Sequence, residues 1–152
     1  MSTAYIDGLK MLARRELSEA QVRQRLARKD HEPDDIDAAI TRLRAERAIS
    51  DVRVAEAIVR METTIHRRGK LRVRMQIERA GIAKEIARRA VDETFDQIED
   101  EAHLEASLKK RLRGRETIED DREFQRLFRY LAGQGFEPDR IMRALTARRR
   151  RE

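Results

Sequence analysis

Two segments far apart in the chain carry nearly the same sequence. Residues 27–40 read ARKDHEPDDIDAAI and residues 132–145 read AGQGFEPDRIMRAL, at a constant offset of 105 positions. In both, a proline stands where the first turn of a helix tolerates it, and aliphatic residues follow with helical spacing. A looser third copy, IERAGIAKEIARRAV, occupies residues 77–91. Such repetition is typical of helical arrays.

The three copies give the array its period. Their apolar anchors Leu26, Ile77 and Leu131 are 51 and 54 positions apart. A longer helix is expected ahead of each copy, at about 4–15, 51–67 and 99–113, because apolar residues recur there with helical spacing. The sequence therefore predicts an all-α fold, an elongated and curved tandem array of three three-helix repeats. The predicted repeats are 1–48, a basic 49–95, and 96–152 with a basic C-terminal tail.

One segment could be taken for a strand. Residues 70–78, KLRVRMQIE, alternate apolar and charged residues, as a half-buried strand does. No second alternating segment exists to pair with it, so we predict a helix. In the helix before it, Val54, Ala55, Ile58 and Ile65 are expected to form the apolar stripe that packs inward.

The composition suits thin helical bundles rather than one large core. Charged residues make up 42% of the chain, aromatic residues 4%, and cysteine is absent. Disulfides and thiolate metal sites are therefore excluded, as in a reducing compartment. No apolar run approaches the length of a membrane span or signal peptide. A soluble, cytoplasmic protein is expected.

Motifs that carry catalysis are missing. The sequence has no Gly-rich phosphate loop, no G-x-S-x-G, no H-E-x-x-H and no cysteine nucleophile. We therefore expect no enzyme, no catalytic residues and no cofactor. A run of acids could hold Mg²⁺, but a solvated segment at a helix start explains it better, since negative charge favours that end of the helix dipole. Its members are Asp92, Glu93, Asp96, Glu99, Asp100 and Glu101.

The histidines do not predict a metal site. His31 occupies the repeat position of Ile82 and Phe136, so a half-buried structural histidine is expected there. His66 and His103 are far apart in sequence, and neither has a ligand-type partner one helical turn away.

Positive charge is concentrated in the middle of the chain. Residues 51–90 hold eleven Lys/Arg against five Asp/Glu, whereas residues 1–50 have a net charge of +1 and residues 91–152 of −1. This concentration predicts a surface for phosphates or an acidic protein face. The alternative is a solvated face whose ion partners are Glu56, Glu62 and Glu78. The candidate binding residues are Arg53, Arg60, Arg67, Arg68, Lys70, Arg72, Arg74 and Arg79.

Two further expectations concern this basic segment. Arg67, Arg68, Arg72 and Arg74 flank Gly69 and should be largely exposed. No aromatic residue lies among the candidates, so base stacking is not expected and nucleic acid would be bound through phosphates, independently of sequence.

The order of motifs resembles the RecX family, over essentially the whole chain. The motifs are RRELSEAQVRQRLARK at 14–29, AISDVRVAEAIVR at 48–60, the basic stretch, and IERAGI at 77–82. The chain departs from the family's pattern at Val54, where an aromatic residue is typical, and at Lys70, where proline usually follows the glycine.

This resemblance implies a non-enzymatic modulator of the RecA recombinase. Such a protein would lie in the groove of the RecA–single-stranded-DNA filament and limit filament growth, strand exchange, ATP hydrolysis and co-protease activity. The eight candidate cations would contact phosphates or acidic RecA surface, and the protein is expected to act as a monomer. Two alternatives stay open: a DNA-binding regulator of helix-turn-helix type, and a basic adaptor for an acidic protein partner.

Overall fold

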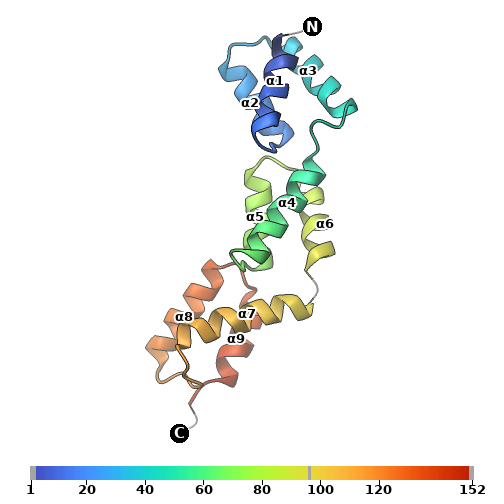
Figure 1. Ribbon diagram of the computed structural model, residues 1–152. Coiled ribbons are helices and arrows are strands. Elements are labelled where there is room, and N and C mark those ends of the chain that lie inside the picture. Colours follow the sequence, from blue (N-terminus) through green and yellow to red (C-terminus); the bar gives the residue numbers. More distant parts are fainter. Residues whose placement is uncertain (1–2, 96, 151–152) are drawn as a thin grey trace. The chain divides into compact units, whose positions relative to one another are not determined.

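The computed structural model describes residues 3–95 and 97–150, and the side chains of all of these except 97–99. Within these residues the chain forms nine helices and no named strand, which confirms the all-α prediction (Figure 1). The helices are α1 (Thr3–Arg14), α2 (Glu19–Arg28), α3 (Pro33–Ala45), α4 (Asp51–Thr64), α5 (Lys70–Arg79), α6 (Lys84–Thr94), α7 (Gln97–Leu112), α8 (Asp121–Gly133) and α9 (Pro138–Ala147). None of the described helices has both the length and the apolar character needed to cross a bilayer.

The chain separates into two compact units that do not follow the chain in simple order. One unit combines Met1–Ile58 with Gln76–Ala90, and the other combines Val59–Met75 with Val91–Glu152. Helices α4 and α5 therefore each contribute residues to both units. The repeat boundaries expected at 48/49 and 95/96, and the expected elongation and curvature, stay predictions.

Helices α1, α2 and α3 pack together around the N-terminal core. Leu17, Val22, Leu26, Ile40 and Leu43 are buried at its centre. Helix α2 begins with a capping box, in which the Ser18 hydroxyl accepts from the Gln21 N–H and the Gln21 side chain accepts from the Ser18 N–H. Pro33 occupies the first turn of α3, as predicted.

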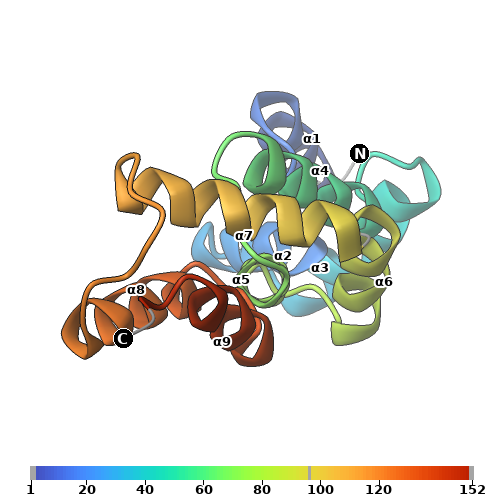
Figure 2. The same cartoon turned by 90° about the horizontal axis from the view of Figure 1, so that it is seen from below.

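Helices α7, α8 and α9 surround the C-terminal core, with α8 and α9 side by side (Figure 2). Leu108, Leu131, Phe136, Ile141 and Leu145 are fully buried there. Helix α8 is capped by Asp120, whose carboxylate accepts from the Glu123 N–H at 2.8 Å. Pro138 starts α9 as Pro33 starts α3, so the repeated Glu-Pro-Asp triplet performs the same local task in both copies.

The alternating segment 70–78 is helical, as predicted, and forms most of α5. In a helix, residues two positions apart point in nearly opposite directions. Val73 and Ile77 are accordingly buried, while Leu71 and Met75 are 44% and 48% exposed. The prediction for α4 holds at Val54 and Ala55, which are buried, but it is wrong at Ile65, which lies beyond the end of α4 and is 69% exposed.

The same type of contact occurs once in each unit. In the first unit, the Ser18 hydroxyl before α2 donates to the Ala80 carbonyl, beside the left-handed Gly81. In the second, the Gly69 N–H before α5 donates to the Gln134 carbonyl at 2.8 Å, beside the left-handed Gly135. The start of one repeat's second helix thus contacts the glycine turn of the next repeat.

Candidate functional site

The eight predicted binding residues differ in exposure. Arg60, Arg67 and Arg79 are exposed, whereas the other five are partly buried. All five have partners within the protein, and these contacts decide how far each is available to bind another molecule.

Arg53 holds the start of α4 in place. Its Nε donates to Glu16 Oε1 at 2.7 Å, and its terminal nitrogens donate to the carbonyls of Arg47 and Ala48 at 3.1 and 3.2 Å. With its donors directed to three partners, Arg53 serves the fold of the first unit rather than an external ligand.

Arg68 and Arg72 both reach the turn between α8 and α9. Arg68 Nη1 donates to Gln134 Oε1 at 2.8 Å, and Arg68 Nε lies 3.8 Å from Glu62 Oε2. Arg72 Nη1 donates to the Gly133 carbonyl at 2.9 Å. These two cations stabilise the second unit from within.

Lys70 and Arg74 are also engaged inside the chain. Lys70 Nζ lies 3.2 Å from Asp92 Oδ1, and Arg74 likewise has an internal interaction. The expectation that the four arginines around Gly69 are largely exposed therefore holds for Arg67 and is wrong for Arg68, Arg72 and Arg74. Counting charges along the sequence overstates the cationic surface, because some arginines have hydrogen-bond partners as far as 66 residues away in the chain.

The structure adds apolar residues that the sequence reasoning missed. Met61, near the end of α4, and Ile65, just beyond it, are exposed four residues apart, as are Leu71 and Met75 on α5. They share the segment 59–75 with the exposed Arg60 and Arg67. Arginine and methionine are enriched in protein interfaces. This segment therefore presents both apolar and cationic side chains that a protein partner could contact. The alternating pattern was the available signal, since alternation on a helix leaves half of its apolar residues outside.

The remaining sequence candidates are structural. His31 is half-buried, as predicted, with Nε2 2.7 Å from Asp7 Oδ2, and this hydrogen bond lowers the pKa of Asp7. Asp100 is wrongly predicted as solvated: its side chain is 2% exposed and lies 2.9 Å from Arg140 Nη1, and burial raises its pKa. Asp96 and the Glu99 side chain lie outside the described residues. No three described His, Asp or Glu side chains gather as a metal ion would require.

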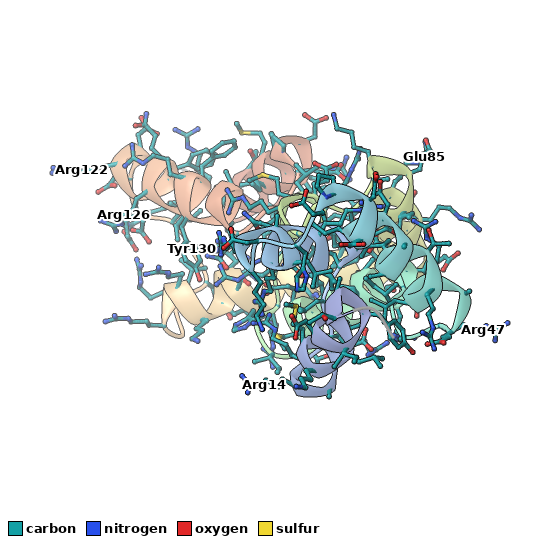
Figure 3. All side chains as sticks on the ribbon, turned by 90° about the horizontal axis from the view of Figure 1, so that it is seen from above. Arg14, Arg47, Glu85, Arg122, Arg126 and Tyr130 are labelled. Atoms are coloured by element: carbon teal, nitrogen blue, oxygen red, sulfur yellow. The ribbon has the colours of Figure 1, made fainter. Side chains whose placement is uncertain are left out.

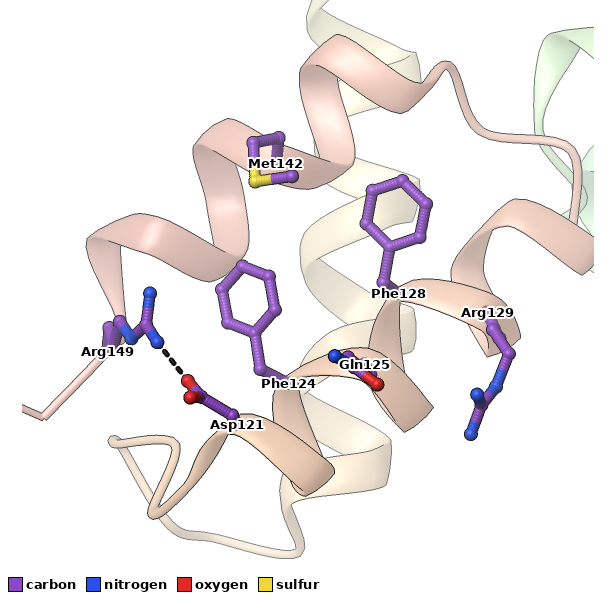
Figure 4. A pocket seen from close by; sticks show the side chains of 7 residues that line it. All are labelled: Asp121, Phe124, Gln125, Phe128, Arg129, Met142 and Arg149. Carbon is purple, nitrogen blue, oxygen red and sulfur yellow. Dashed lines mark hydrogen bonds and ion pairs between the residues drawn. The ribbon is translucent and has the colours of Figure 1, made fainter.

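Two hollows open on the C-terminal bundle. One, of about 580 Å³, lies between α8 and α9 and is lined by Phe124, Phe128 and Met142, with the Arg149–Asp121 ion pair at its edge (Figure 4). The other, of about 360 Å³, lies at the end of α7 and is lined mainly by arginines.

The sequence is similar to a family model and to several known proteins. The family model for the first three-helix domain of RecX matches residues 4–43. The regulatory protein RecX of Chromohalobacter salexigens is 32% identical over 147 residues, which cover 95% of this chain and 91% of the relative. That of Syntrophotalea carbinolica is 30% identical over 134 residues, 88% of each chain.

A solved structure is similar over nearly the whole length. The crystal structure of RecX from Lactobacillus salivarius superposes with a TM-score of 0.78, over 96% of this chain and 94% of that one, at 23% sequence identity. The two chains therefore share the same fold. Given the identity and coverage of its sequence relatives, the chain belongs to the RecX family of regulatory proteins.

Proposed function

We propose that this protein is a non-enzymatic modulator of the RecA recombinase. It binds the RecA–single-stranded-DNA filament as a monomer and limits filament growth, strand exchange and co-protease activity. The observation that carries the proposal is the 32% identity to a regulatory protein RecX across 95% of the chain.

The surface chemistry of segment 59–75 supports a protein partner. Met61, Ile65, Leu71 and Met75 expose apolar side chains there. Methionine adapts its shape to a partner, and exposed arginines such as Arg60 and Arg67 can pair with carboxylates or phosphates through a planar, bidentate fork. This segment therefore suits a filament that presents protein and phosphates together.

The internal contacts narrow the candidate binding residues. Arg60, Arg67 and Arg79 are the proposed contacts, because their guanidinium groups have no hydrogen bond or ion pair among the side chains described. Arg53, Arg68 and Arg72 stabilise the fold. Lys70 and Arg74 could contact the filament only by giving up their internal interactions.

A RecA ATPase assay on single-stranded DNA tests the proposal. Added at sub-stoichiometric amounts, the protein should lower hydrolysis by RecA from the same organism, because a modulator bound along or at the end of a filament affects many subunits. Unchanged hydrolysis would overturn it. Tighter binding to naked duplex than to filaments would indicate a DNA-binding regulator, and RecA-independent binding to an acidic protein would indicate an adaptor.

A further inference from the structure

The arginine-lined hollow at the end of α7 belongs entirely to the C-terminal bundle. It is formed by the last turn of α7, the loop that follows, and α8 from Glu123 to Tyr130. The lining residues are Arg111, Arg113, Arg115, Glu123, Arg126, Leu127 and Tyr130. Residues 91–152 have no excess of positive charge in the sequence, so the structure alone gathers these cations.

The single acid of the hollow already has a partner. Glu123 accepts from Arg115 at both oxygens, with Nη2–Oε1 at 2.5 Å and Nη1–Oε2 at 3.2 Å. This bidentate pair lowers the pKa of Glu123, so the carboxylate is ionised and its charge is compensated by Arg115. Arg111, Arg113 and Arg126 form no ion pair with any side chain that the structure describes. Three positive charges therefore share one hollow, an arrangement that an anion would stabilise.

One of these cations also forms a flat surface. The Arg111 guanidinium lies 3.8 Å above the Tyr130 ring, in a cation–π contact. Arg111 itself is exposed, so the pair can be reached from solvent. Arg126 and Tyr130 extend from the side of α8 that faces α7 (Figure 3). Unstacked nucleobases pack on aromatic rings and on guanidinium planes of this kind.

We infer that this hollow binds one nucleotide unit of a single-stranded nucleic acid. Arg113 and Arg126 contact the phosphodiester, and the base stacks on the Arg111–Tyr130 pair. An acidic protein could pair with the arginines but would not use the flat surface of the Arg111–Tyr130 pair. A base within a duplex is already stacked on its neighbours, so it is not free to stack on this pair. The third repeat thus supplies the base contact that the middle basic segment, without an aromatic residue, lacks.

Binding of a labelled oligothymidylate to the full chain tests this inference, with an abasic deoxyribose-phosphate strand as the second ligand. Arg113→Gln/Arg126→Gln should weaken binding to both strands and flatten the slope of log affinity against log salt by about 1.4. Tyr130→Leu should weaken binding to oligothymidylate roughly 5-fold or more, the effect of losing one stacked base, and leave the abasic strand unaffected. The control is Arg122→Gln/Arg129→Gln, two exposed positions of α8 outside the hollow.

Several outcomes would overturn the inference. An equal loss of affinity in the control double variant would indicate general electrostatic attraction. If Tyr130→Leu weakened binding to the abasic strand as much as to oligothymidylate, base stacking would be excluded. Inorganic phosphate or a mononucleotide competing as well as the strand would assign the site to a free phosphate compound. No change in any variant would show that the strand does not bind in this hollow. Circular dichroism melts exclude unfolding, and since RecA is absent from this assay, it can fail independently of the proposed function.

Discussion

Gly135 lies directly against Arg72. A Cβ atom on Gly135 would stand 2.8 Å from Arg72 Cα, and closer still to the Arg72 Cβ and backbone nitrogen. The equivalent glycine of the preceding repeat, Gly81, would clash with the Ala20 Cβ in the same way. Both glycines have positive φ, 97° and 80°. At both glycines, successive repeats approach too closely for a side chain to fit.

Gly135→Ala should therefore destabilise the protein through two separate effects. An alanine with positive φ costs about 1–2 kcal/mol, and the overlap with Arg72 adds a packing cost of about 1–3 kcal/mol. Gly114→Ala isolates the first effect, because Gly114 has φ 86° but nothing within 4 Å of its would-be Cβ. Gly133→Ala has neither and should be neutral or stabilising by about 0.5–1 kcal/mol.

Urea unfolding of the three variants measures these differences in the free energy of unfolding. The order of stability should be Gly133→Ala, then Gly114→Ala, then Gly135→Ala. If Gly135→Ala and Gly114→Ala lose the same amount, the turn moves away from Arg72 without cost and the close contact does not stabilise the fold.

The local features of this fold could be predicted from sequence, and the long-range ones could not. Ser18, Pro33 and Pro138 start helices through contacts within a single turn, so their spacing reveals them. Arg68 and Arg72 were taken as free cations because their partners are 66 and 61 residues away. The Arg111–Tyr130 contact could not be predicted for the same reason, since it depends on how α7 and α8 pack.

Arg67 and Arg68 are neighbours in sequence with different expected roles. Arg68→Gln should lower the free energy of unfolding by about 1–2 kcal/mol, because it removes a charge-assisted hydrogen bond to Gln134 and the ion pair with Glu62. Arg67→Gln, at an exposed position, should change it by less than about 0.5 kcal/mol. Thermal or urea unfolding compares them, and equal losses would contradict the assignment of Arg68 to the fold.

The Arg115–Glu123 pair should make stability depend on pH. The hydrogen bond from Arg115 lowers the pKa of the Glu123 carboxyl below its usual 4.5 in the folded state. As the pH falls, this carboxyl is therefore protonated in the unfolded chain before it is protonated in the folded one. The stabilisation is complete above about pH 4.5 and is lost as the pH drops through the lower folded pKa. The difference in unfolding free energy between the wild type and Glu123→Gln should therefore shrink from about pH 7 to about pH 3. A difference that stays constant with pH would show that the pair contributes nothing through its charge.

The exposed arginines of the basic segment should determine how salt affects filament binding. Replacing Arg60, Arg67 and Arg79 together by Gln should leave the helices folded, because their guanidinium groups have no partner among the side chains described. Each phosphate contact on single-stranded DNA contributes roughly 0.7 to the slope of log affinity against log salt. Loss of three such contacts should flatten the slope by about 2, measured by fluorescence anisotropy on RecA filaments held with a slowly hydrolysed ATP analogue.

The matched control for this experiment lies in the first repeat. Arg14, Arg15 and Arg25 are also exposed, and Arg14 extends away from its helix (Figure 3). Acids, however, nearly balance the charge of residues 1–50. Replacing these three by Gln should change the slope much less, since a net charge near zero attracts few phosphates. A fall in affinity with an unchanged slope in the first triple variant would mean that Arg60, Arg67 and Arg79 contact protein rather than DNA. Equal shifts in both triple variants would mean that the middle segment is only a solvated surface and that the filament is bound elsewhere.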